Sequence, residues 1–475
     1  MCADAPPAAV GATGGEPHAA SFRDPGGFVF LRDGILYRQV QLAYREHYDL
    51  FVSSGLFRSL VGDGLLVGHE ESAVQPASPG AYKVLQPSPI DVISYPFEWS
   101  FGQLKDAALL TLRVQRRALA HGMVLKDASA YNVQYQRGRP IFIDTLSFER
   151  HLDGQPWAAY GQFCQHFLAP LALMARVDIR LGRLLSTHLD GVPLDLASRL
   201  LPRRTWLRPG LAMHIHAHGA AQRRYDASSK SNRTPPKRAA SVSRRGLLGI
   251  VDSMERTILA LEWRPAGTEW ADYEATHRYA EASQEDKRRL VKSWFDALVP
   301  VPERVVDLGA NAGAYSRLIA GGGATVVSVD GDPAAVELNY RRASAETATT
   351  ILPLLADLTN SGSGVGWDGA EREPLFERVS ADFTLCLALV HHLAIGHNVP
   401  FDRIARWLAG VAPRLIIEFV PKHDEQVQRL LASRVDVFPN YGAAAFQHAF
   451  GRYFATERRQ SIAGSERTLY QMRRL

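Results

Sequence analysis

The chain has 475 residues, about three times the usual length of one domain, so two domains are expected. Hydrophobic residues make up 46% of it and charged residues 22%, a composition that supports sizeable cores and excludes disorder throughout. The 54 Lys and Arg residues against 49 Asp and Glu residues give a net charge of +5. Over this length, that charge indicates a partner only if it is concentrated in one segment.

Three cysteines, Cys2, Cys164 and Cys386, are widely separated and odd in number. This pattern excludes a disulfide framework and a cysteine-rich zinc module, and it predicts a reducing, cytoplasmic compartment. Cys386 lies inside an apolar run and is predicted to be a small buried residue.

No segment has the pattern of a membrane anchor. Residues 1–20 are small and rich in Pro and Gly, without the basic start and apolar centre of a signal peptide, so we predict a disordered tail. The most apolar run, residues 167–175, is interrupted by Pro170 and is far shorter than the ~20 residues of a spanning helix. We therefore expect no membrane partner.

The clearest change of composition lies at residues 222–246, which have a Pro-Pro pair, many Ser and Ala residues and almost no large aliphatic side chains. Such a segment cannot bury a core, and it predicts a basic flexible linker. We expect one domain at residues 21–221 and a second at residues 247–475. The linker has one acid, Asp226, and eight basic residues: Arg223, Arg224, Lys230, Arg233, Lys237, Arg238, Arg244 and Arg245.

This linker carries the net charge of the chain, because 46 basic residues face 48 acidic ones elsewhere. Basic residues can contact nucleic-acid phosphates. Few aromatic residues lie among them, however, so a small molecule, a protein or a glycan is favoured over nucleic acid as the partner.

Residues 304–475 alternate between apolar runs and helix-like segments. Continuous β-rich runs between helices are typical of a parallel sheet buried on both faces, so the sequence predicts an α/β domain. The last two runs are joined by Gly464-Ser465 and predict an antiparallel hairpin. The predicted strands are residues 304–308, 325–329, 351–356, 382–390, 414–420, 453–462 and 468–472.

A glycine-rich turn follows the first of these strands. Gly309 and Gly313 let the backbone approach a ligand closely, and the preceding acid, Asp307, suits an ammonium group rather than a pyrophosphate. Asp330 ends the second strand, where a carboxylate can accept bonds from both hydroxyls of a ribose. Asp357 ends the third strand, where it can accept a bond from an adenine amino group. The G-x-G-x-x-G pattern of dinucleotide-binding enzymes is absent.

These features resemble the class I S-adenosylmethionine-dependent methyltransferases, from Asp252 to the C-terminus. The resemblance implies a Rossmann-like seven-stranded sheet with an antiparallel last strand, S-adenosylmethionine as cofactor, and transfer of a methyl group. In that family the turn holds the methionine part, and the acids after the second and third strands hold the ribose and the adenine. The matching cofactor-binding residues are Asp307, Gly309, Ala310, Asn311, Gly313, Asp330, Asp357, Leu358 and Leu387.

One position departs from the family pattern. Asn311 stands where a glycine is commoner, but asparagine tolerates left-handed backbone geometry, so the turn is expected to survive. The helix-like stretch at residues 268–295 would cover the cofactor pocket, with Trp270, Tyr273 and Tyr279 as candidates to line it.

Catalysis needs alignment of the two reacting groups, and a base only where the acceptor must lose a proton. His391 and His392 directly follow the fourth strand and are the candidate bases; packing, or capping of the next helix, is the alternative. Glu418 and residues 421–424 follow the fifth strand and either orient the substrate or form a solvated loop.

The first half of the chain carries a different set of residues. Asp127 and Asn132, five residues apart, are followed by a turn at Arg137-Gly138 and an apolar strand that ends at Asp144. Two acids and an amide on consecutive loops can hold a divalent ion and a phosphate.

This set resembles the core of protein-kinase-like folds, including aminoglycoside phosphotransferases, and implies an α+β domain. Asp127 matches the catalytic aspartate, Asn132 the metal-binding amide and Asp144 the metal-binding acid. Residues 94–99 match the hinge between two lobes. Arg38 and Glu46 match the ATP-binding lysine and its partner.

Departures from the kinase pattern predict a degenerate domain. Arginine does not easily replace the lysine that fits between two phosphates. We therefore expect this domain to bind a substrate, a nucleotide or a partner. The alternative is that the acid and the amide only cap turns. The other departures are Leu125-Lys126 for His-Arg, Thr145-Leu146 for Phe-Gly, and a glycine loop reduced to Gly26-Gly27.

His214, His216 and His218 alternate along the chain, which places three imidazoles on one face only in a strand. Their surroundings are helix-like and contain no nearby cysteine or acid, so we expect no metal site.

As a whole, the sequence predicts a cytoplasmic enzyme with a degenerate kinase-like domain before a methyltransferase domain. Two alternatives stay open. One is a methyltransferase-fold protein that only binds or regulates, and the other is an ATP-dependent phosphotransferase that uses Asp127, Asn132 and Asp144.

Overall fold

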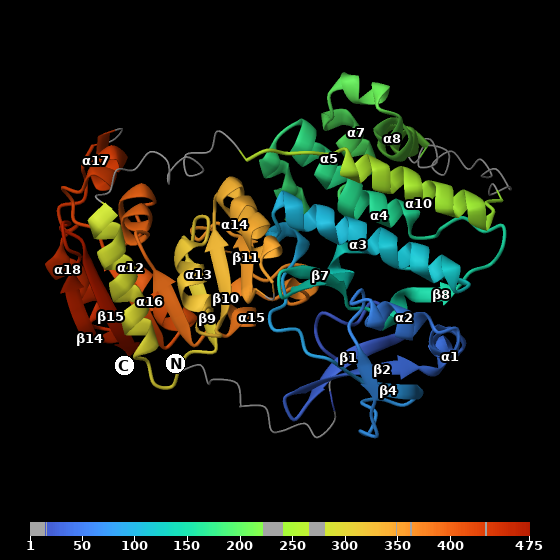
Figure 1. Cartoon of the computed structure of the whole chain (residues 1–475), viewed down its shortest axis with the longest axis horizontal. Helices are drawn as coiled ribbons and strands as arrows, with labels where there is room; N and C mark the ends of the chain where they lie inside the picture. Colours follow the sequence, from blue (N-terminus) through green and yellow to red (C-terminus); the bar gives the residue numbers. More distant parts are fainter. Residues whose placement is uncertain are drawn as a thin grey trace, which may run out of the picture.

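The computed structural model describes residue 15 and residues 17–221, 241–265, 281–347, 349–361, 363–432 and 435–475. Most of the predicted tail and linker, and the candidates Trp270, Tyr273 and Tyr279, lie outside these ranges. An N-terminal part (blue to green) lies beside a C-terminal part built on a large sheet (yellow to red) (Figure 1). Within the described ranges, no helix is both long and apolar enough to cross a membrane.

A four-stranded antiparallel sheet begins the N-terminal part, in the order β1-β2-β4-β3. Asp33 and Gly34 have φ angles of 52° and 75°, which form the tight turn between β1 and β2. Two helices, α1 and α2, follow β2 in the chain. The bounds are β1 Gly27–Arg32, β2 Ile35–Gln41, α1 Arg45–Ser53, α2 Leu56–Gly62, β3 His69–Glu71 and β4 Ala81–Pro87.

A long helix, α3 (Phe101–Ala120), organises the rest of the N-terminal part. Ser100 and Gln103 cap its first turn reciprocally, and the apolar residues of the helix are buried on several of its faces. The β6–β7 hairpin, the antiparallel pair β5–β8 and a group of helices pack around it. Their bounds are β5 Met123–Leu125, β6 Val133–Gln136, β7 Arg139–Phe142, β8 Phe148–Arg150, α4 Tyr160–Phe163, α5 Ala169–Arg176, α6 Leu184–Thr187, α7 Leu194–Leu200 and α8 Pro209–Leu211.

The helix α10 (Arg244–Leu259) lies alongside α3 (Figure 1). Ser243 caps its N-terminus, and Val242 pairs with Gly154, so the last residues of the predicted linker are ordered structure. By packing, α10 belongs with the N-terminal part, which differs from the predicted boundary at residue 247. Composition missed this because the basic start of the helix resembles the linker before it.

The C-terminal sheet has seven strands in the order β11-β10-β9-β12-β13-β15-β14. The first five in this order are parallel, and β15 is antiparallel to both β13 and β14. This confirms the predicted hairpin and the mostly parallel α/β sheet. The strands are β9 Arg304–Leu308, β10 Thr325–Asp330, β11 Ile351–Leu355, β12 Phe383–Cys386, β13 Arg414–Phe419, β14 Phe454–Ser461 and β15 Thr468–Arg474.

Helices cover both faces of this sheet. Val305 and Val326 face one layer, which contains α12 and α13, while Val306 and Val327 face the layer that contains α16. Alternate residues of a strand point to opposite faces, so each strand contributes to two cores. The helices are α12 Glu281–Asp296, α13 Ala314–Ala320, α14 Pro333–Ala345, α15 Leu375–Val379, α16 Phe401–Val411, α17 Glu425–Ala432 and α18 Ala443–Phe450.

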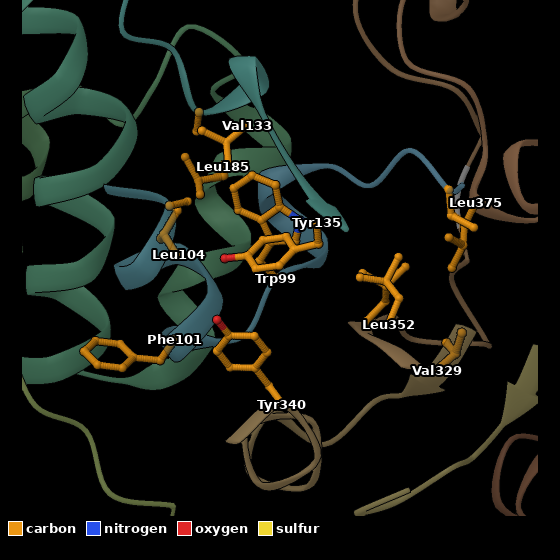
Figure 2. Close-up of a cluster of buried hydrophobic side chains, with 14 of the residues drawn as sticks. Trp99, Phe101, Leu104, Val133, Tyr135, Leu185, Val329, Tyr340, Leu352 and Leu375 are labelled. Atoms are coloured by element: carbon orange, nitrogen blue, oxygen red, sulfur yellow. The ribbon is translucent and has the colours of Figure 1, made fainter. Parts of the chain in front are cut away.

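One hydrophobic core continues across the junction between the two parts (Figure 2). Trp99 packs edge-on against Tyr135, and Tyr135 in turn packs edge-on against Tyr340 of α14. The Tyr340 hydroxyl donates to Asp106 at 2.6 Å, and the Gly102 amide donates to Glu337 at 2.7 Å. The two parts therefore fold against each other through the start of α3.

A buried ion pair closes the same junction. Arg378 of α15 bonds to Glu98 and to the carbonyl of Ile93, and its guanidinium lies 4.1 Å from the centre of the Tyr95 ring. The side chains of Arg378 and Glu98 are 3% and 7% exposed. Tyr95 and Glu98 fall in the segment 94–99 that was predicted to match a hinge. The segment contributes to the contact with the C-terminal part, and its role as a hinge stays a prediction.

We predict that Arg378→Met destabilises the protein by about 3 kcal/mol, because it leaves the Glu98 carboxylate buried without its partner. The double variant Glu98→Gln/Arg378→Met should recover a large part of this loss, since an uncharged glutamine side chain can still accept the bond from the Tyr95 amide that Glu98 accepts at 2.7 Å. Chemical denaturation compares the variants. Equal stability of the single and double variants would contradict the role of the pair.

Candidate functional site

The main cavity lies where the strand order of the C-terminal sheet reverses. The chain runs outward from β9 to β11 and then returns to β12 on the other side of β9. Ligand crevices in parallel α/β sheets form beyond the carboxyl ends of strands at such a point. A cavity of about 890 Å³ lies there, lined by the strand ends and by the first turns of α12.

The turn after β9 uses its own amide groups. Asn311 has a φ of 49°, which confirms that it takes left-handed geometry, and Gly309 has a φ of 72°. All five amides at positions 309–313 donate within the fold, at 2.6–3.1 Å, to the Val329 carbonyl (twice), Asp330, Asn311 Oδ1 and the Ala310 carbonyl. Because these donors are occupied, the turn offers no cradle of amides for a phosphate.

Asp307 is buried beneath this turn. Its carboxylate accepts a bond from the Ser316 hydroxyl at 2.6 Å and is 2% exposed. Burial raises the pKa of Asp307 to about 6, while the Ser316 bond and the charge of Lys287 act in the opposite direction. Burial disfavours the charged form of this carboxylate, and a cationic ligand above it would stabilise that form.

Asp330 and Asp357 lie at neighbouring strand ends on the same cavity. Burial raises the pKa of Asp330, although amides of Asp332 and Asn311 stabilise the charged form. Burial acts to raise the pKa of Asp357 as well, but bonds from Thr359 and the charge of Arg183 lower it overall. Each Asp330 oxygen accepts one of these amides, at 2.8 Å, and a carboxylate oxygen can accept a second bond.

Two cations border the cavity beside a buried acid. Lys287 of α12 bonds to Glu418 at 2.5 Å, and Arg467 lies 3.4 Å from the same carboxylate. Burial alone would raise the pKa of Glu418, but these two charges lower it. Arg467 also forms two bonds with Asp424, at 2.7 and 2.9 Å, which links the loop after β13 to the hairpin.

The two candidate bases have different positions. His392 lines the cavity, whereas His391 is 1% exposed and does not line it. Burial lowers the pKa of His392 to about 4, with the charges of His397 and Arg467 acting in the same direction. At neutral pH the His392 imidazole is therefore uncharged, and the same burial makes it a weak base. The predicted catalytic role of His391 has no support in this geometry.

Most predicted cofactor residues meet at the cavity, and a few do not. Gly313 does not line it; a Cβ there would lie 2.2 Å from Asn339 Oδ1, so this glycine serves the packing of α13 on α14. Glu418 lies behind Lys287, and residues 421–424 do not line the cavity. The predicted residues that line it are Asp307, Gly309, Ala310, Asn311, Asp330, Asp357, Leu358, Leu387 and His392.

Sequence reasoning missed several lining residues. Lys287 belongs to the stretch predicted to cover the pocket, so the sequence predicted that it lies on a helix. The sequence did not predict that it pairs with Glu418. His397 and Arg467 follow no recognised motif. Ala388 has a φ of 50°, a strained value for a residue with a side chain, and such strain concentrates at functional sites.

The N-terminal residues Asp127, Asn132 and Asp144 also come together. Burial raises the pKa of Asp127, the charge of Asp144 adds to this, and a bond from Asn132 opposes it. Asp144 is held by Arg38 and by the Ser147 hydroxyl. Arg38 thus pairs with Asp144, and the predicted partner Glu46 is exposed. The kinase-like fold of this part stays a prediction.

Leu146, close to Asp144 in the chain, belongs to a small buried core. Leu146 is fully buried among Val40, Tyr44 and Tyr48. A Cβ at Gly27 would lie 2.6 Å from Leu146 Cδ1 and 2.2 Å from the Gln39 carbonyl oxygen. Gly27 is therefore needed to pack β1 against Leu146, and Leu146 is one of the departures from the kinase pattern.

The three histidines at 214–218 lie on a helical segment, as their surroundings predicted. His214 bonds to Tyr160 and Ser253, and His216 bonds to Ser198 and Thr205, each at 2.7–2.9 Å. Among the described residues, no group of three or more His, Cys, Asp or Glu side chains is arranged to hold a metal ion.

We predict that Asp307→Asn stabilises the protein at pH 7.5 by about 1–2 kcal/mol, because it removes a buried charge whose pKa is raised. The wild-type carboxyl gains its proton as the pH falls through about 6, so this advantage should shrink at pH 5. Thermal unfolding at the two pH values measures it. An advantage that is the same at both pH values would contradict the raised pKa.

No protein-family model matches the chain. The chain is 37% identical over 468 residues to nodulation protein NoeA of Rhizobium meliloti (strain 1021), covering 96% of both proteins. Solved structures match parts of it. Magnesium protoporphyrin IX methyltransferase from Synechocystis PCC 6803 is 19% identical and covers 42% of this chain and 88% of its own, with a TM-score of 0.30.

The N-methyltransferase NodS from Bradyrhizobium japonicum WM9 is 10% identical over 41% of this chain and 98% of its own, with a TM-score of 0.31. The bifunctional kinase-methyltransferase WbdD is 16% identical over 44% of this chain and 42% of its own, with a TM-score of 0.30. Matches of this size leave the activity to be argued from the site itself. The similarity to NoeA, in contrast, extends along almost the whole of both proteins, and the chain belongs to the NoeA family.

Proposed function

We propose that the chain is an S-adenosylmethionine-dependent methyltransferase that acts in the cavity at the ends of β9, β10, β11 and β12. The observation that carries this proposal is a turn without free amides beside three carboxylates at successive strand ends. A diphosphate would meet three carboxylates there, and the turn has no cradle of free amides to hold it. A ligand with an ammonium, a ribose and an adenine amino group offers a partner to each acid.

The residues present fit this cofactor. Asp307 would hold the ammonium of its methionine part, Asp330 the two ribose hydroxyls, and Asp357 with Leu358 the adenine. A bound cofactor supplies a methyl group activated on a sulfonium. The cavity of about 890 Å³ is at the upper end of the size of ligand sites, which leaves space for part of an acceptor.

His392 is the group that would take a proton from the acceptor. It lines the cavity and is uncharged at neutral pH, because burial lowers its pKa to about 4. Lys287 and Arg467 keep Glu418 charged behind the wall, so that acid does not compete for the proton. The remaining task of the chain is to align the acceptor with the methyl group.

The acceptor in this proposal is a small molecule, a protein or a glycan, and the enzyme works in the cytoplasm. The name of the NoeA relative refers to nodulation, and we extend that role to this chain. The N-terminal part would hold the substrate or a partner. Phosphate transfer is less well supported, because Arg38 bonds to Asp144, and Leu146, which departs from the kinase pattern, is fully buried. A protein that binds the cofactor without turnover is the second alternative.

We predict that S-adenosylhomocysteine binds with one site per chain and that Asp330→Ala weakens its binding at least tenfold, because the ribose loses its acceptor. Calorimetry measures both affinities. Asp296→Ala is a matched control, since its carboxylate is exposed and pairs with Lys292 at the far end of α12. Binding of magnesium-ATP alone, with no heat from S-adenosylhomocysteine, would overturn the proposal.

Turnover with labelled cofactor separates an enzyme from a binding protein. Cell extract fractions serve as acceptors, and label should enter one fraction with the wild type and not with Asp330→Ala. We predict that His392→Gln lowers this turnover by about 10²-fold or more but leaves the affinity for S-adenosylhomocysteine within threefold. His423→Gln, on an exposed residue outside the cavity, is the control. Unchanged turnover in His392→Gln would exclude His392 as the base.

A further inference from the structure

A second cavity lies in the N-terminal part, remote from the methyltransferase site. It has a volume of about 710 Å³ and is formed where α8 and the chain before it pack against the last turns of α10 and the end of α5. Gly210 permits this close packing, because a Cβ there would lie 1.9 Å from the Thr257 hydroxyl oxygen. The floor of the cavity is therefore built by a tight helix contact.

Four arginines line this cavity: Arg176, Arg204, Arg208 and Arg256. No acidic residue is among the described residues that line it. The acids of α10 point elsewhere, since Asp252 and Glu255 both pair with Arg116 of α3 at 2.6 Å. The cavity thus concentrates positive charge that the neighbouring helix does not neutralise.

The arginines lack anionic partners within the part of the chain that the structure describes. Arg204 and Arg208 form no ion pair or side-chain hydrogen bond there. Arg176 donates to the Ala260 carbonyl at 3.0 Å, but its Nε is buried without a partner. Burial and the charges of Arg208 and Arg204 lower the pKa of Arg176, and the exposed acid Glu262 opposes this only in part.

The rim of the cavity includes exposed apolar surface. Leu207 is 85% exposed and lines the cavity, and its neighbour Trp206 is 52% exposed and stacks on His216. Guanidinium groups bind phosphate oxygens through paired N–H donors, and arginine is favoured where phosphate geometry matters. A ligand that suits both features carries a phosphate or diphosphate joined to an apolar portion.

We propose that this arginine cavity binds the phosphate or diphosphate group of such a ligand. The site is independent of the proposed methyl transfer, because none of its residues lines the cofactor cavity. The phosphate can belong to a soluble molecule or to the headgroup of an anionic lipid. The two sources share the same chemistry in the cavity and differ in their need for the apolar rim.

The first test measures binding of inorganic pyrophosphate to the full chain by calorimetry. The wild type should bind at one site, and Arg204→Gln/Arg208→Gln should bind at least tenfold more weakly. The control, Arg199→Gln/Arg203→Gln, removes the same charge from neighbouring positions that do not line the cavity, and it should bind as the wild type does. Arg256→Gln tests the opposite wall on α10 and should also weaken binding.

The second test uses vesicles of phosphatidylcholine with and without phosphatidic acid, in a sedimentation assay. A lipid headgroup as the source predicts sedimentation only with phosphatidic acid, lost in both Arg204→Gln/Arg208→Gln and Leu207→Ser. A soluble source predicts no sedimentation and pyrophosphate binding that Leu207→Ser does not change. If the wild type binds neither pyrophosphate nor the vesicles with phosphatidic acid, the proposal is wrong. Equal weakening by the cavity and control pairs would also overturn it, because only general surface charge would then be involved.

Discussion

The packing of α3 against both parts of the chain is the contact on which the whole arrangement depends. Its first turn bonds to α14 and its aromatic neighbours meet Tyr340, while its later turns support α10 and the short hairpins. The same buried core holds Trp99 of the N-terminal part and Leu352 of the large sheet (Figure 2). Neither part can lose this contact without exposing apolar surface, so the two behave as one structural unit.

The sequence predicted the C-terminal sheet well because its strands are continuous apolar runs and its turns contain glycines and acids. The hairpin at the end of the chain, the left-handed Asn311 and the acids at three strand ends all follow from local patterns. The position of α10 does not, because its partner α3 lies more than one hundred residues away in the chain. The pattern of an amphipathic helix indicates that one face is buried, but it does not indicate which element covers that face.

The same limit applies to the sites. Asp307, Asp330 and Asp357 were accessible to sequence reasoning because each ends a strand, and parallel strands bring their ends to one edge. Gly313 was assigned to the site by its place in the glycine-rich turn, and His391 by its place after the fourth strand. In the structure, Gly313 packs against α14 and His391 is buried. The arginine cavity could not be predicted, since its four residues come from α5, from α10 and from the chain before α8, and match no motif. The concentration of basic residues in the sequence pointed instead to the linker.

One surface contact joins the N-terminal part to the cavity at the strand ends. Arg183, just before α6, lies 3.8 Å from the carboxylate of Asp357, and both side chains are more than one third exposed. An exposed pair of this kind contributes at most about 1 kcal/mol, which corresponds to a factor of about five in an equilibrium constant. Any coupling through it is reciprocal. A ligand that moved Arg183 would change the affinity at Asp357 by no more than this factor, and occupancy at Asp357 would act back on that ligand equally, so this contact modulates binding and does not switch it on or off.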